Sequence, residues 1–280
     1  MTSTDVPAGS GIPGGSPGGA LGTLTALGRL SDYWVTASLR TWRGSVVSAF
    51  LSPIFYVLAM GVLLGGFIEG DPDRLEGAPT YLAFIVPGLV AAHAMQTAMA
   101  ETSWPVFSNF KWNRVYDSMV ATPLTVRQVA LAHLVSVTVR ITLICAVFVV
   151  VTAPFGVYAT WWGPLLGLGV QALTGICFGS LMYGYSCRIT TDAAFGVLFR
   201  LVVFPMFLFS GAFFPVANLG PVGERLAQLT PLWHGVHLSR MLCLDTVDGP
   251  VALLNLAVLL VVTAVGVRWA VTGLERRMAW

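Results

Sequence analysis

Six long apolar stretches run along the chain, and polar segments of different length separate them. Each stretch supplies about 20 apolar residues, the length that an α-helix needs to cross a hydrocarbon core of roughly 30 Å. The stretches cover residues 46–67, 81–99, 129–152, 162–185, 193–214 and 251–271. This pattern predicts an all-α polytopic membrane protein with six transmembrane helices, in which a longer mixed segment joins the fifth and sixth helices.

The residues before the first stretch show two different patterns. Residues 1–22 are rich in Gly, Pro and Ser and hold too little apolar surface to offset the entropy lost on ordering, so we expect a disordered tail. In residues 23–45, apolar positions recur at spacings of three and four from Leu27 to Ala37, which is typical of an amphipathic helix on a membrane surface. A basic anchor for the first span would also explain this segment. Residues 46–277 then form the transmembrane domain.

Composition agrees with a membrane protein. Of the 280 residues, 56% are hydrophobic and only 10% are charged, and the mean hydropathy is +0.78. A soluble globular chain has about 25% charged residues. The use of fourteen arginines and a single lysine is typical of a GC-rich bacterial genome. We therefore expect a multi-pass protein of a bacterial cell membrane.

Basic residues predict the orientation, because the cytoplasmic flanks of short loops are enriched in Lys and Arg. If the N terminus is cytoplasmic, ten basic residues fall inside and three outside. The inner residues are Arg29, Arg40, Arg43, Lys111, Arg114, Arg127, Arg188, Arg268, Arg276 and Arg277. The outer residues are Arg74, Arg225 and Arg240. Both termini are therefore predicted to be cytoplasmic.

The chain lacks the motifs of common catalytic sites. A phosphate-binding P-loop ends in Gly-Lys-Ser/Thr because its lysine must reach the β and γ phosphates, whereas Lys111 lies between Phe110 and Trp112. Neither an H-E-x-x-H zinc helix nor a G-x-S-x-G nucleophile turn occurs. No basic-aromatic surface indicates nucleic-acid binding. We expect no catalytic residues, and no cofactor or metal bound by this chain.

Histidines and cysteines give little further chemistry. His234 and His237 lie three residues apart beside Trp233, a spacing that could hold a metal ion, but no third ligand is close in sequence. Such aromatic clusters are common at a membrane interface, so packing there is the favoured interpretation. The cysteines, which form no C-x-x-C pair, are expected to be small buried packing residues. They are Cys145, Cys177, Cys187 and Cys243.

Two arginines fall inside predicted spans. Arg140 lies about eleven residues into the third stretch, ~16 Å along a helix and near the middle of a bilayer. It would either face the bundle interior and pair with a polar group, or snorkel if the helix begins deeper in the cytoplasm. Arg200 is expected to snorkel, and His93 and His133 to form hydrogen bonds between helices. The spans hold almost no carboxylate except Glu101, which disfavours a proton- or cation-coupled transporter.

Three segments carry a resemblance to a known family. They are YLAFIVPGLVAAHAMQTAMAET with its Pro-Gly turn, the hairpin VYDSMVATPLTVRQVALAHL, and FPMFLFSGAFFPVANLGPVGERLAQLTPLWHGVHLSRML. In this order and spacing they resemble the membrane subunits of type-2 ABC exporters (ABC-2 permeases). The permeases that export nodulation lipo-oligosaccharides and those that confer daunorubicin-type drug resistance are the most similar. The resemblance covers residues 30–277, although residues 111–113 are more aromatic than the family pattern.

The resemblance implies a six-helix permease that moves a hydrophobic drug, lipid or glycolipid out of the cell. A separate ABC ATPase would bind ATP and Mg²⁺, and a second permease, identical or paralogous, would complete a 2+2 complex. A coupling helix over residues 108–122 would dock on the ATPase, and the turn 187–192 would make a second contact. The expected contact residues are Asn109, Lys111, Trp112, Arg114, Asp117, Met119, Arg188 and Asp192.

The resemblance also implies a substrate path and a re-entrant element. The second and fifth helices would line the path, with side chains from Met95, Gln96, Met99, Phe204, Phe207 and Phe209. Residues 213–242 would form short helices that dip into the outer leaflet and pack on the bundle. Two alternatives stay open: a membrane-embedded lipid-modifying enzyme, which would need clustered Asp, Glu or His at one membrane face, and an ATP-independent channel or scaffold.

Overall fold

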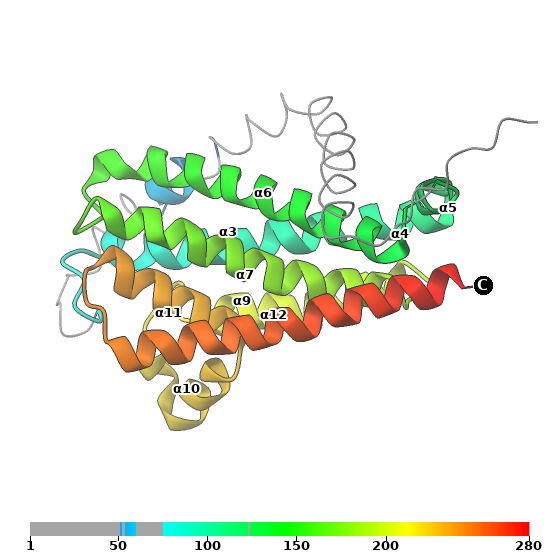
Figure 1. Ribbon diagram of the computed structural model, residues 1–280. Coiled ribbons are helices and arrows are strands. Elements are labelled where there is room, and N and C mark those ends of the chain that lie inside the picture. Colours follow the sequence, from blue (N-terminus) through cyan, green and yellow to red (C-terminus); the bar gives the residue numbers. More distant parts are fainter. Residues whose placement is uncertain (1–50, 52–53, 60–74, 123, 280) are drawn as a thin grey trace, which may run out of the picture.

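The computed structural model describes residues 51, 54–59, 75–122 and 124–279, and all regular structure in these ranges is helical (Figure 1). The predicted tail and amphipathic helix and most of the first predicted span lie outside the described residues. Four described helices are long and apolar enough to cross a membrane. They are α3 (Tyr81–Thr102), α6 (Val126–Thr152), α7 (Trp162–Ser186) and α12 (Gly249–Met278). They coincide with the predicted second, third, fourth and sixth stretches, which confirms an all-helical polytopic membrane protein.

Local sequence signals set where several helices begin. The hydroxyl of Thr80 accepts a hydrogen bond from the backbone N–H of Ala83 at the start of α3. At the start of α6, Thr125 and Gln128 form a reciprocal capping box, at 3.3 Å and 2.9 Å. Each cap satisfies backbone N–H groups that the first helical turn leaves without a partner.

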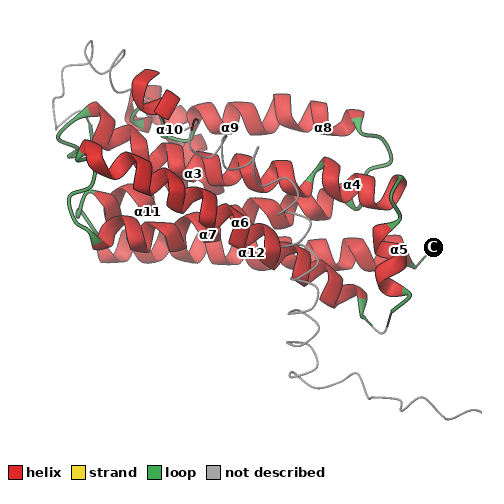
Figure 2. Cartoon of the chain, turned by 90° about the horizontal axis from the view of Figure 1, so that it is seen from above, coloured by secondary structure: helices red, strands yellow, loops and turns green. Residues whose placement is uncertain are grey.

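The predicted fifth span is shorter than the sequence suggested. It runs from Ala193 to Phe209 as α8 (Ala193–Leu198), a π-helical turn η4 (Phe199–Val203) and α9 (Phe204–Phe209), and it lies along one edge of the bundle (Figure 2). The prediction of a helix to residue 214 was wrong. Gly211 has a φ of +80°, a left-handed conformation that glycine adopts readily, and the chain turns there.

Helix α7 lies at the centre of the bundle and packs against α3, α6, α11 and α12. Small residues allow these helices to approach closely. A Cβ on Gly235 would lie 2.5 Å from the Thr174 hydroxyl, and one on Gly266 would overlap Ser180. We compared the most apolar 18 residues of each helix. Of this stretch, 78% is buried in α3 and 56% in α7, whereas only 28% is buried in α6 and 17% in α12. The outer faces of α6 and α12 are therefore the faces available to lipid.

The segment between the last two apolar stretches forms short helices. These are η5 (Val216–Leu219), α10 (Gly220–Gln228) and α11 (Pro231–Cys243). Helix α11 packs on α3, α7 and α12, which confirms the prediction of short helices packed on the bundle. Pro231 at the start of α11 suits this arrangement, because proline lacks the N–H that a first turn leaves unused.

Replacing Gly163 by alanine should destabilise the bundle, because the new Cβ would overlap the carbonyl oxygen of Leu242. Overpacking of this kind costs about 1–3 kcal/mol. Gly169 on the same helix has no such neighbour within 4 Å, so G169A is the matched control. That variant should keep or slightly raise stability, by up to ~1 kcal/mol. Thermal unfolding in detergent measures both, and equal Tm values for the two variants would contradict the packing described for α7.

Candidate functional site

Two short helices form a corner at the end of the bundle where the C terminus lies (Figure 1). Helix α4 (Trp104–Lys111) continues from α3, and α5 (Val115–Val120) follows after a break. We call residues 104–120 the α4–α5 corner. The prediction of one helix over residues 108–122 was wrong in this respect. The N–H groups of Trp112 and Asn113 both bond to the carbonyl of Ser108, and Arg114 turns the chain with a φ of +47°, which is uncommon for a residue other than glycine.

The inner face of the corner is fixed to helices α6 and α7 of the bundle. Tyr116 is buried, and its hydroxyl lies 3.0 Å from Nδ1 of His133 on α6. Its ring also lies against Phe110, at 4.6 Å between centroids, and against Tyr183 of α7, at 6.5 Å. The bond to His133 confirms the prediction that this histidine joins two helices.

The outer face of the corner holds most of the predicted partner residues. Lys111, Trp112, Arg114 and Asp117 are exposed, and Asn109 is half-buried. The Trp112 side chain is 60% exposed although its indole meets the ring of Phe107 edge-on at 5.9 Å. Met119, by contrast, faces inward and packs in a core cluster with residues of α6, α7 and α12.

The turn at residues 187–192 lies at the same end and is held by α12. The Arg277 guanidinium donates to the carbonyls of Cys187 and Ile189, at 3.1 Å and 2.7 Å, and lies 5.1 Å from the ring of Phe110. Arg277 therefore links the last helix to both the turn and α4. Sequence reasoning had counted it only as an inner charge.

Both predicted residues of that turn reach the surface. Arg188 donates to the carbonyls of Gly184 and Trp269, at 2.7 Å and 3.2 Å, and stacks over the Trp269 ring at 4.8 Å. It stays exposed, as does Asp192. The two residues thus add a charged margin beside the α4–α5 corner.

A groove of about 620 Å³ lies between α3 and the α8–α9 segment. Its lining residues are Gln96, Phe199, Arg200, Val203, Phe204 and Phe207. Three of the six predicted path residues are therefore in it. Met95 and Met99 are buried in the core cluster behind it, and Phe209 lies outside its walls. Arg200, which was expected only to snorkel, adds a positive charge to a groove whose other lining residues are apolar except for Gln96.

The other end of the bundle is held together by a buried arginine. Arg240 on α11 is only 4% exposed, and it donates to Glu76 at 2.8 Å and to the carbonyls of Phe84 and Gly211 at 3.2 Å and 2.6 Å. Its guanidinium also lies 3.8 Å from the centroid of the Phe84 ring. Burial lowers the pKa of Arg240, and the Glu76 carboxylate opposes this shift. The sequence analysis counted Arg240 only among the outer charges and gave no signal for this burial.

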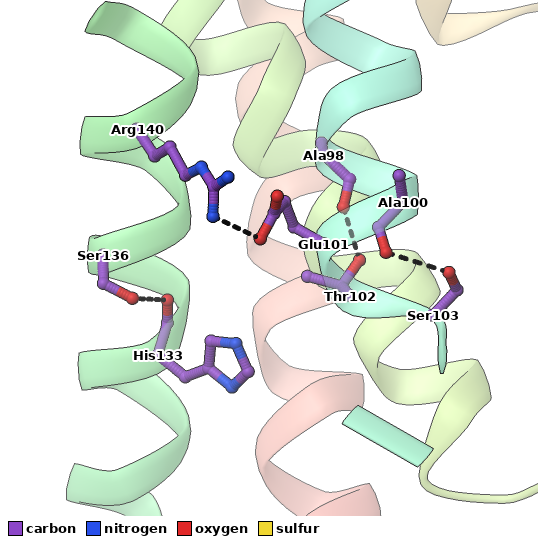
Figure 3. A network of polar contacts seen from close by, with 8 residues as sticks. All are labelled: Ala98, Ala100, Glu101, Thr102, Ser103, His133, Ser136 and Arg140. Atoms are coloured by element: carbon purple, nitrogen blue, oxygen red, sulfur yellow. Dashed lines mark hydrogen bonds and ion pairs between the residues drawn. The ribbon is translucent and has the colours of Figure 1, made fainter. Parts of the chain in front are cut away.

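Arg140 and Glu101 form an ion pair between α6 and α3. Figure 3 shows the guanidinium pointing across to the carboxylate, with 3.1 Å between Nη1 and Oε2. Of the two alternatives left open for Arg140, pairing with a polar group is the one observed. The two side chains are 29% and 28% exposed, so the pair sits at the margin of the core.

The remaining histidines and cysteines have packing partners. Nδ1 of His234 lies 2.7 Å from Asn255, whose amide nitrogen lies 3.0 Å from Nδ1 of His237. Trp233 stacks on the His237 ring at 4.7 Å. Among the described residues, no group of three His, Cys, Asp or Glu side chains could hold a metal ion. All four cysteines are buried, as predicted.

Residues 32–244 match the family described as ABC-2 type transporter. Nodulation protein J of Sinorhizobium fredii (strain NBRC 101917 / NGR234) is 32% identical over 216 residues, which cover 76% of this chain and 80% of that protein. Nodulation protein J of Rhizobium leguminosarum bv. trifolii is 31% identical over 228 residues, covering 81% and 83%. The protein of that name from Bradyrhizobium diazoefficiens is 31% identical over 208 residues, covering 73% and 77%.

Replacing Arg240 by methionine should lower the free energy of unfolding by about 3 kcal/mol, because the carbonyls of Phe84 and Gly211 would lose their charged donor in the interior and Glu76, which is 33% exposed, would lose its ion-pair partner. E76Q should cost less, since an amide oxygen can still accept the hydrogen bond and Arg240 keeps its bonds to the carbonyls of Phe84 and Gly211. Arg225 on α10 is exposed, so R225M is the control and should change stability by no more than about 0.5 kcal/mol. Thermal denaturation in detergent gives the comparison. An R240M variant as stable as R225M would refute the importance of this network.

Proposed function

The chain belongs to the ABC-2 type transporter family, and from this membership we propose that it is the permease subunit of an ATP-driven exporter whose ATPase is a separate polypeptide. Such a subunit needs a surface through which a soluble partner can move membrane helices. The observation that carries the proposal is the structure of the α4–α5 corner. Its outer face exposes aromatic and charged side chains, while its inner face packs on helices of the bundle.

Charge supports a cytoplasmic position for this corner. Lys111 and Arg114 lie in the corner. Arg188 lies in the turn after α7, and Arg276 and Arg277 lie in the last turn of α12, which is at the same end of the bundle (Figure 1). Cytoplasmic flanks of membrane helices are enriched in such residues. An ATPase that uses cytoplasmic ATP would meet this end of the bundle.

The connections of the corner suit the transmission of force. Helix α4 continues α3, the Tyr116–His133 contact reaches α6, and Arg277 reaches α12 and the turn at residues 187–192. A displacement of the corner would therefore move several helices together rather than bend a loop. ATP would drive the change of state only by binding better to one arrangement of the paired ATPases than to the other.

The groove between α3 and the α8–α9 segment is our candidate for the substrate path. Because α3 is attached to the corner and the α8–α9 segment lies at the edge of the bundle, movement of the corner would change the width of the groove (Figure 2). Its phenylalanine walls, with the amide of Gln96 and the charge of Arg200, suit an amphipathic drug, lipid or glycolipid. The exposed apolar face of α8–α9 also suits packing against a second permease.

Substitution of Trp112 tests the partner contact. An exposed tryptophan at the centre of an interface contributes about 2 kcal/mol or more, so W112A should weaken binding of the cognate ATPase at least ~30-fold. Trp161, 80% exposed at the opposite end of the bundle, provides the control W161A, which should bind the ATPase as the wild type does. Affinity is measured with the purified permease and ATPase in nanodiscs. Equal affinities for W112A and W161A would exclude the corner as the contact.

Narrowing the groove tests the path separately. F207W should reduce ATP-driven export about tenfold while ATPase binding is unchanged, because the larger ring occupies space between α3 and α9. Tenfold corresponds to about 1.4 kcal/mol in the barrier to passage. V261W on the exposed face of α12 is the control and should transport normally. Uphill transport by the permease alone, without any ATPase, would overturn the proposed function and favour an independent transporter.

A further inference from the structure

A second groove, of about 570 Å³, lies between the first half of α6 and the second half of α12. It shares no lining residue with the groove beside α8–α9. Its floor is apolar and includes Leu131, Val267 and Val271. Two arginines from different helices, Arg127 of α6 and Arg268 of α12, line the same groove.

The charges around this groove are available to a ligand. Arg127 and Arg268 are both exposed, and within the described part of the chain neither forms an ion pair or a side-chain hydrogen bond. Glu275, also exposed, is the one carboxylate among the lining residues and lies two helical turns beyond Arg268 on the same face of α12. The groove therefore carries an excess of positive charge above an apolar floor.

The location of the groove identifies what surrounds it. Helix α6 begins and α12 ends at the bundle end that carries the α4–α5 corner (Figure 1). The outer faces of both helices are largely unburied and apolar, so the groove opens to the bilayer rather than to the protein interior. Arginines near the end of a membrane helix extend their guanidinium groups to the level of the lipid headgroups.

We propose that this groove binds an anionic phospholipid of the surrounding leaflet. Its phosphate is held between Arg127 and Arg268, and one acyl chain lies on Leu131, Val267 and Val271. Basic pockets between membrane helices are suited to anionic headgroups, and guanidinium groups bind phosphate with charge-assisted hydrogen bonds. A soluble phosphate would leave the apolar floor unused. The bound lipid bridges α6 and α12. Both helices contact the α4–α5 corner, so the lipid stabilises the position of the corner.

The test uses the purified full-length permease in detergent, with bound lipid counted by native mass spectrometry. The probes are phosphatidylglycerol and phosphatidylcholine with identical acyl chains, and glycerol 3-phosphate as a headgroup without a tail. The wild type should retain phosphatidylglycerol in preference to the other two. The double variant R127Q/R268Q should bind it more weakly by about fivefold for each arginine removed.

Two further variants separate a built site from general charge attraction. R114Q/R276Q removes the same net charge from exposed residues at the same end but outside the groove, and it should bind phosphatidylglycerol as the wild type does. E275Q removes the only carboxylate of the lining and should tighten binding. Equal loss in the two double variants, or no preference for phosphatidylglycerol over phosphatidylcholine, would overturn the proposal. So would weaker binding by E275Q, which has no reason to disturb the fold.

Discussion

Hydrocarbon offers no partner to a polar group, so the polar side chains of this bundle must be satisfied within the protein. Among the described residues, small hydroxyl groups bond to carbonyls of their own helix, as Thr102 does to Ala98, whereas larger polar side chains bond between helices. Arg240 joins α11 to α3 and to the turns at Glu76 and Gly211, Arg140 joins α6 to α3, and Gln171 joins α7 to Ser239 of α11 at 2.7 Å. Each contact fixes the rotation of a helix that apolar packing alone would leave free to turn.

The two ends of the bundle use this constraint differently. At one end Arg240 is enclosed and holds three segments at a single point. At the other end Tyr116 and Arg277 satisfy groups on the inner face of the corner, while Lys111, Trp112 and Arg114 stay exposed. The first end is built to stay closed around one buried cation. The second end combines an inner face that is held in place with an outer face whose exposed side chains are available to bind a partner.

Motif order carried the family assignment further than any single residue could. The Pro-Gly pair of the second span, the hairpin and the Ser-Gly turn with its following helices lie in the part of the chain that matches the ABC-2 type transporter family. The prediction of a turn at the Pro-Gly pair was wrong, because both residues lie within the continuous helix α3. The site residues were harder to predict. Four of the six candidates in the corner, Lys111, Trp112, Arg114 and Asp117, are exposed, but Met119 is buried because the break after Lys111 turns α5 and brings that side chain inward.

By itself the sequence determined the lengths of the apolar stretches and the short helices between the last two of them, since helix length and proline act over a few neighbouring residues. Only the tertiary structure decided which polar groups meet. Arg240 and Glu76 are 164 positions apart, and Arg140 and Glu101 are 39 apart. Spans that are apolar on every side give no signal for the face that turns inward, so such partners are chosen by helix rotation and packing, which no local spacing encodes.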